Sequence, residues 1–117
     1  MHVHVVMVTL KDPADADRCA EAMASMAGRI PGLVALDVRR NELAEPNACD
    51  LALTTTWQDV DAYIAYKTDP VHLEVAAVVR SLMASATTLD HTLDHRPDHT
   101  LDHRPDAIDG ADDRVAP

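Results

Sequence analysis

Two kinds of apolar periodicity alternate along the first 93 residues, and their order limits the folds that this chain can adopt. Continuous or alternating β-branched stretches predict strands, whereas apolar residues three or four positions apart predict amphipathic helices. In chain order the patterns predict a strand at 3–10, a helix at 13–30, strands at 33–38 and 51–57, a short helix at 60–67, a longer helix at 71–83 and a strand at 86–92. This order is typical of an α+β, ferredoxin-like βαββαβ fold with a four-stranded antiparallel sheet.

Aspartate, proline and glycine set several of the predicted boundaries. Asp12 and Asp69 are each followed by proline, which is typical of a helix N-cap and the first helical position. Pro31-Gly32 should end the first helix, whose buried stripe we expect to comprise Cys19, Met23, Met26 and Ile30. The helix at 71–83 is apolar on most sides, so we expect it to be deeply buried.

The first strand is apolar on both faces, although the predicted helices can cover only one face of the sheet. A second sheet from a symmetric copy is the economical cover for the other face. The pattern therefore predicts a homodimer.

Charge and composition exclude several kinds of partner. The chain of 117 residues has a net charge of −10, which opposes binding to nucleic acid. The longest aliphatic run, at 75–79, is far shorter than the roughly 20 apolar residues of a membrane helix, and the N-terminus does not resemble a secretory signal. We therefore expect a cytoplasmic protein that does not bind a membrane, with Cys19 and Cys49 as free thiols. An excess of Arg over Lys and many Ala residues suggest a bacterial genome rich in GC.

The residues after 93 differ in character from those before. The sequence HTLDHRPD at 91–98 is repeated without change at 99–106. Such short, charged, proline-containing units bury little surface, so we expect a domain at 1–93 and an acidic, disordered tail at 94–117. The tail histidines leave open a weak metal site, but the repeat is also explained by a neutral duplication. Inside the domain we expect no metal site, and the scarcity of glycine gives no nucleotide-cofactor loop, so we expect no cofactor.

Several local strings resemble one family. They are HVVMVTLK at 4–11, IPGL at 30–33, CDLAL at 49–53, WQD at 57–59, AY at 62–63, DPVH at 69–72 and LD at 89–90. In this order and spacing they resemble the stress-responsive A/B barrel (Dabb) domain family, of the dimeric α+β barrel superfamily. The resemblance implies a ferredoxin-like protomer whose sheet pairs with that of a second copy.

A plant branch of that family contains polyketide cyclases, and the resemblance to them implies site residues. His72 and Tyr66 match the positions of the cyclase histidine and tyrosine, and His4 matches a histidine in the first strand. Aldol-type ring closure needs a base for a C–H proton and a donor for the enolate oxygen, roles that His72 and Tyr66 would fill. We expect His4, Met23 and Tyr63 to contact the ligand, which would be a small hydrophobic molecule.

Three functions remain open at this point. The first is a homodimer with a small-molecule cleft and no assigned reaction, and the second is a cofactor-free cyclase-like enzyme. The third is a structural or interaction protein whose cleft is filled by side chains, with His72, Tyr66 and His4 in packing roles. The chain has only three aromatic residues and no Phe, so a pocket would be smaller than that of a cyclase, or filled. The enzyme hypothesis requires His72 and Tyr66 to converge on a cavity.

Overall fold

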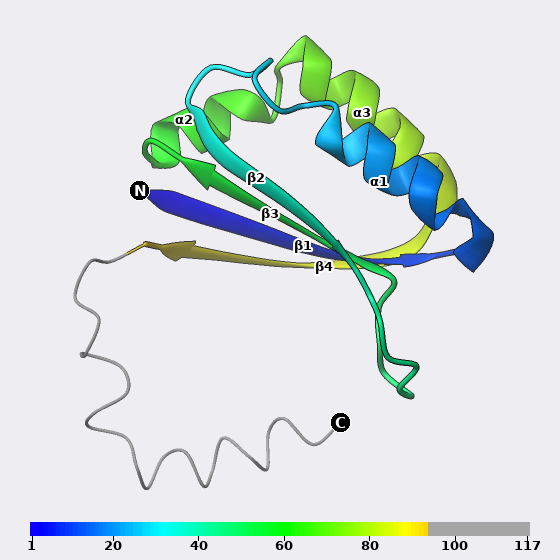
Figure 1. Ribbon diagram of the computed structural model, residues 1–117. Coiled ribbons are helices and arrows are strands. Elements are labelled where there is room, and N and C mark those ends of the chain that lie inside the picture. Colours follow the sequence, from blue (N-terminus) through cyan, green and yellow to red (C-terminus); the bar gives the residue numbers. More distant parts are fainter. Residues whose placement is uncertain (94–117) are drawn as a thin grey trace, which may run out of the picture.

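Four antiparallel strands form a single sheet in the computed structural model, which describes residues 1–93 (Figure 1). They are β1 (His2–Leu10), β2 (Leu33–Arg40), β3 (Leu51–Trp57) and β4 (Met83–Thr92), in the spatial order β2-β3-β1-β4. A 3₁₀ turn, η1 (Pro13–Asp15), leads into α1 (Ala16–Ala24), and α2 (Val60–Tyr66) and α3 (Pro70–Leu82) follow β3. All three α-helices cover the same face of the sheet (Figure 1). The predicted α+β, ferredoxin-like fold is confirmed.

Aspartate side chains begin the helical segments, as the sequence predicts. Asp12 accepts a hydrogen bond from the backbone N–H of Ala14 at 3.0 Å, and Asp69 accepts one from that of Val71 at 2.8 Å. Asp59 caps α2 in the same way, through the N–H of Ala62 at 2.8 Å. Each cap satisfies a backbone donor that has no partner within its helix.

The first helix is shorter than predicted, because it ends at Ala24 and not near Ile30. Residues 25–30 continue as tight turns, and Gly28 has a φ of +74°, which no regular right-handed helix contains. Met26 and Ile30 are nevertheless buried. The apolar period therefore continues beyond the helix, and this is why the sequence pattern overestimates the helix length.

Two further predictions, about the longer helix and the last strand, are wrong in detail. The longer helix is not deeply buried, because only Val75 and Leu82 of α3 are buried and Leu73 remains 51% exposed. The last strand begins at Met83, directly after α3, and not at Ala86. The extra residues pair with the end of β1, where Leu10 lies opposite Met83.

The main core lies between the helices and one face of the sheet. Alternate residues of β3 point into it, namely Leu51, Leu53, Thr55 and Trp57, and all four are buried. The hydroxyl of Thr55 accepts a 2.9 Å hydrogen bond from Trp57 Nε1, so the indole N–H is satisfied within the core. Met23, Met26 and Cys19 supply much of the helical side of this core.

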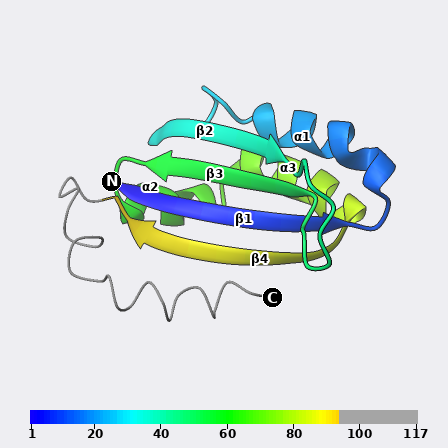
Figure 2. The same ribbon diagram turned by 60° about the horizontal axis from the view of Figure 1, so that its bottom comes forward.

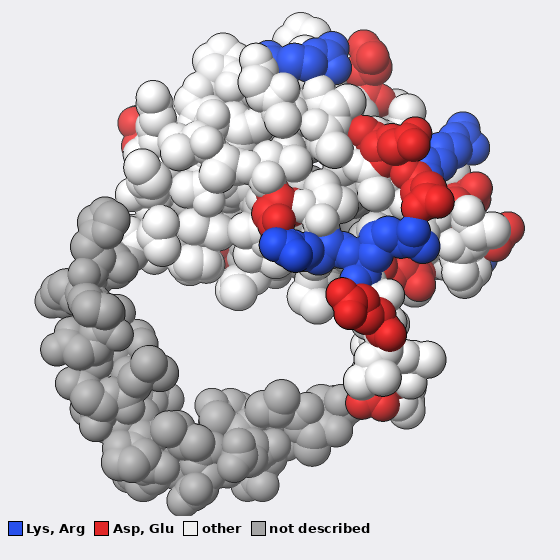
Figure 3. All heavy atoms as spheres, in the orientation of Figure 1, with Lys and Arg blue, Asp and Glu red and all other residues white. Residues whose placement is uncertain are grey.

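The opposite face of the sheet is not covered by any helix of the described residues (Figure 2). Met7 and Leu89 lie on it and are 46% and 61% exposed. On the face drawn in Figure 3, charged side chains gather at the end of the domain where β2 ends and η1 lies, and few are visible at the end beside α2.

Other expectations concern the whole chain. Cys19 and Cys49 are both free thiols, as predicted. No helix within residues 1–93 is long and apolar enough to cross a bilayer. The predicted tail at 94–117 and its metal-site alternative lie outside the described residues.

Candidate functional site

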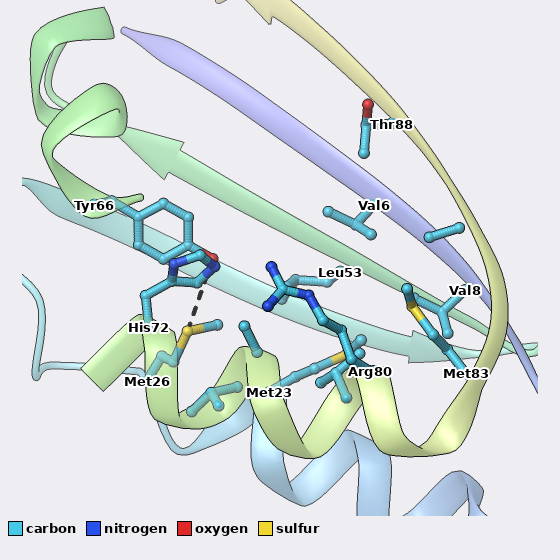
Figure 4. A pocket seen from close by; sticks show the side chains of 14 residues that line it. Val6, Val8, Met23, Met26, Leu53, Tyr66, His72, Arg80, Met83 and Thr88 are labelled. Carbon is cyan, nitrogen blue, oxygen red and sulfur yellow. Dashed lines mark hydrogen bonds between the residues drawn. The ribbon is translucent and has the colours of Figure 1, made fainter. Parts of the chain in front are cut away.

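A cleft opens between α3 and the strands β1 and β4, and its inner part is apolar (Figure 4). This inner cleft has a volume of about 240 Å³. Its apolar walls come from the sheet, from α1 and the turn after it, and from α3: Val6, Val8, Leu53, Met23, Met26, Val75, Ala76, Val79, Met83 and Ala86. Such a volume lies just below the roughly 300–1,000 Å³ of typical ligand pockets.

A polar outer cleft of about 430 Å³ adjoins the inner one, and five residues line both: Val6, Tyr66, His72, Arg80 and Thr88. His4, Tyr63, Lys67 and Asp90 complete the outer lining. An apolar interior with convergent polar groups at its opening is the usual form of a small-molecule site.

His72 lies in the first turn of α3, where Asp69 and Pro70 begin the helix. Its Nδ1 lies 3.2 Å from the carbonyl oxygen of Lys67. Because a carbonyl only accepts, Nδ1 carries the proton in this contact, and Nε2 of the neutral ring keeps its lone pair. Burial lowers the pKa of His72 below its ordinary value of 6.5, and the nearby Arg80 acts in the same direction, although the bond to Lys67 opposes the change. At neutral pH the imidazole is therefore an unprotonated base.

Tyr66 is the last residue of α2 and lies directly beside His72, with ring centroids 4.0 Å apart. The Tyr66 ring also lies beside that of Trp57, with ring centroids 4.5 Å apart. The Tyr66 hydroxyl donates to the sulfur of Met26 at 3.9 Å, a weak acceptor that a ligand oxygen could replace. Burial, with a smaller contribution from Tyr63, raises the pKa of Tyr66 to about 12. The phenol therefore stays protonated and is able to donate at neutral pH.

Asp90 joins two histidines of the first strand at the far side of the outer cleft. Its Oδ1 lies 2.8 Å from His4 Nδ1 and 2.9 Å from His2 Nε2. Because a carboxylate only accepts, both rings donate to it. Burial tends to raise the pKa of Asp90, but the hydrogen bonds from His2 and His4 outweigh it and hold the pKa below 3.8. The Tyr63 ring lies 4.6 Å from that of His4, so His4 is held on two sides.

The structure brings the five residues predicted from the sequence to one cleft. His72, Tyr66 and Met23 line its inner part, and His4 and Tyr63 line its outer part. His72 and Tyr66 converge on a cavity, which the enzyme hypothesis required. Within residues 1–93, no group of three or more His, Cys, Asp or Glu side chains is placed to hold a metal ion.

Sequence reasoning missed four polar residues of the cleft: Lys67, Arg80, Thr88 and Asp90. Arg80 could have been found, because helical spacing from His72 leads to Val75, Ala76, Val79 and Arg80 on one face. Thr88 and Asp90 required the register of β4 against β1, in which Asp90 lies opposite His4.

Comparisons with solved structures agree with this fold. A dimeric ferredoxin-like protein of unknown function from Jannaschia is 23% identical, with a TM-score of 0.67 over 79% of this chain and 98% of that one. A Dabb family protein from Mesorhizobium loti is 18% identical, with a TM-score of 0.67 over 79% and 95%. SnoaB from Streptomyces nogalater, a cofactor-independent oxygenase, is 21% identical, with a TM-score of 0.62 over 82% and 95%.

A search of functionally curated proteins gives no match. The Stress responsive A/B Barrel Domain family (Dabb) matches residues 3–93, which include every helix and all but the first residue of the sheet. The chain therefore belongs to the stress responsive A/B barrel domain family.

Proposed function

We propose that this protein is a homodimer whose cleft binds a compact, largely apolar small molecule. One observation carries the proposal: the apolar inner cleft ends where the rings of His72 and Tyr66 meet. An open cavity of about 240 Å³ argues against the alternative in which side chains fill the cleft. The two free thiols fit the reducing cytoplasm that we propose as its location.

Adjacent alanines of α3 offer a matched test of ligand binding. Ala76 lines the inner cleft, whereas Ala77 is exposed and outside it. We expect 2-naphthol, a neutral bicyclic probe, to bind the wild-type protein in calorimetry with a saturable isotherm. Ala76→Phe should fill the cavity and abolish binding, and Ala77→Phe should bind as wild type does. Equal binding by both variants would place the probe elsewhere and contradict the proposal.

The homodimer is supported by the uncovered sheet face. Met7 alternates along β1 with Val6 and Val8, which line the inner cleft, so Met7 points away from the helices and is exposed, as is Leu89. Such a surface is costly in water unless another surface covers it. The similar proteins from Jannaschia, Thermobifida fusca and Bacteroides fragilis are described as dimeric.

A second candidate function, general acid–base catalysis, is favoured by the tautomer of the neutral His72 ring. With Nδ1–H bound to the Lys67 carbonyl, Nε2 is free to accept a proton from an activated C–H group. The Tyr66 hydroxyl could then donate to the oxygen of the resulting enolate. This is the first half of an aldol-type ring closure, such as the cyclase hypothesis needs. The fold accommodates enzymes, since SnoaB is a cofactor-independent oxygenase.

Deuterium exchange tests this catalytic role without knowledge of the natural substrate. The probe is 2-tetralone, a compact bicyclic ketone whose C1 protons exchange through the enolate in D₂O. We expect the protein to accelerate exchange, and His72→Gln to lower the acceleration by about 10²-fold. Tyr66→Phe should slow exchange with little change in probe affinity. Acceleration that survives in His72→Gln would contradict the assignment of this residue as the base.

A further inference from the structure

Two basic side chains stand at the outer cleft of an otherwise acidic protein. Arg80 lines both parts of the cleft and Lys67 lines the outer part, whereas the whole chain has a net charge of −10. Neither residue forms an ion pair with any side chain of residues 1–93. Among the Lys and Arg side chains of residues 1–93, only Arg39 and Arg40 form ion pairs, each with an aspartate.

The single carboxylate of the cleft is already engaged. Asp90 accepts hydrogen bonds from both His2 and His4 on Oδ1, so this oxygen already has two donors. Lys67 instead lies with its Nζ 5.1 Å from the centroid of the Tyr63 ring. The outer cleft therefore presents two cations and no carboxylate bound to them.

Arg80 extends over the cavity toward His72 (Figure 4). The guanidinium is near enough to His72 to disfavour protonation of that ring. A planar guanidinium fork matches the two oxygens of a carboxylate, which makes charge-assisted hydrogen bonds with it. An anion bound here would lie where the apolar inner cleft meets the polar outer cleft.

We propose that the ligand of this cleft is a compact apolar carboxylic acid, with its carboxylate on Arg80, its apolar body in the inner cleft and Lys67 adding attraction at the opening. This inference rests on the proposed ligand-binding function and specifies the ligand class. A phosphate ester is the competing anion. The apolar wall favours the smaller, singly charged carboxylate over a dianion, because removing a dianion from water costs more free energy.

Three probes with the same ring system separate these possibilities: 2-naphthoate, neutral 2-naphthamide and 2-naphthyl phosphate. We expect calorimetry to give wild-type protein about tenfold tighter binding of the carboxylate than of the amide. Arg80→Gln should weaken binding of the carboxylate more than binding of the amide, and so abolish this preference. The control Arg29→Gln, in the turn after α1 and outside the cleft, should keep it.

The NMR titration of His72 gives an independent readout, because a carboxylate beside Arg80 should raise the pKa of that imidazole and the amide should not. Equal affinity for carboxylate and amide, or a preference that persists in Arg80→Gln, would overturn the inference but leave the proposed function intact. Tighter binding of the phosphate than of the carboxylate would overturn the carboxylate assignment. Binding of none of the three probes would contradict the proposed function itself.

Discussion

The imidazole of His72 lies against the phenol ring of Tyr66, with ring centroids 4.0 Å apart and the ring planes inclined by 42°. The short connection between α2 and α3 produces this contact, since Tyr66 ends one helix and Pro70 begins the next. The carbonyl of Lys67, within the connection, accepts from His72 Nδ1 and holds the ring. Local chain geometry thus positions both residues at the junction of the inner and outer cleft.

The lowered pKa of His72 makes stability depend on pH in a defined direction. Its pKa is below the ordinary 6.5 in the folded protein, so the unfolded chain binds the proton more readily. The contribution of the neutral His72 to the free energy of unfolding is fully present above pH 6.5 and is lost as the pH falls through the lower pKa of the folded protein. We expect urea unfolding at pH 7 and pH 5 to show a smaller loss of stability for His72→Gln than for wild type. An equal loss in both proteins would contradict the direction of this shift.

Removal of Asp90 should destabilise the protein, because His4 is 8% exposed and its Nδ1–H would lose its acceptor. We expect Asp90→Ala to cost about 1–2 kcal/mol at pH 7 in denaturant unfolding. The pKa of Asp90 is lowered below 3.8 in the folded protein. The difference in stability between wild type and Asp90→Ala should therefore narrow as the pH falls through that folded-state pKa. The control Glu45→Ala, in the exposed loop after β2, should change stability by less than about 0.5 kcal/mol. A cost for Asp90→Ala as small as that of the control would refute this role.

Gly28 and Gly32, which follow the end of α1, allow a paired test of backbone strain and steric clash. Both have positive φ, +74° at Gly28 and +82° at Gly32. A Cβ at Gly28 would meet nothing within 4 Å, whereas one at Gly32 would lie 2.6 Å from Cβ of Ala62 in α2. Gly28→Ala should therefore cost only the backbone strain, about 1 kcal/mol. Gly32→Ala should cost roughly 2–4 kcal/mol, because the clash adds to the strain. Equal losses in thermal or urea unfolding would show that α2 moves away freely.

A charge on the uncovered sheet face should dissociate the proposed dimer. Met7→Asp places a carboxylate where Met7 is 46% exposed and where we expect the partner sheet. Sedimentation equilibrium at micromolar concentration should give the mass of two chains for wild type and of one for this variant. Ile64→Asp, at a 56% exposed position of α2 in the helical layer, should stay dimeric. A wild-type mass of one chain would contradict the dimer.

Sequence reasoning could predict the features that depend on neighbouring residues. The helix starts at Asp12 and Asp69 follow from side-chain capping and proline, and both caps are present. The strand at 51–57 follows from its own composition, and in the structure its alternate residues Leu51, Leu53, Thr55 and Trp57 are buried. By contrast, the end of α1 depends on Gly28, which lies inside an apolar period that continues to Ile30.

The parts that escaped prediction depend on distant pairings. The contact of Asp90 with His4 joins residues 86 positions apart, and only the register of β4 against β1 specifies it. The exposure of Leu73 follows from how α3 lies on the sheet, and a helix that is apolar on most sides does not indicate which side is covered. Arg80 could be predicted only in part. Helical spacing places it on the same face of α3 as His72, but spacing alone does not show that a cavity lies at that face.

The most direct test of the ligand-binding cleft is NMR observation of the His72 and Tyr66 ring signals during titration with 2-naphthol. We expect saturable shifts of both rings in wild type and in Ala77→Phe, and no such shifts in Ala76→Phe. Shifts confined to Met7 and Leu89 on the uncovered sheet face, or ring signals that never saturate, would contradict it.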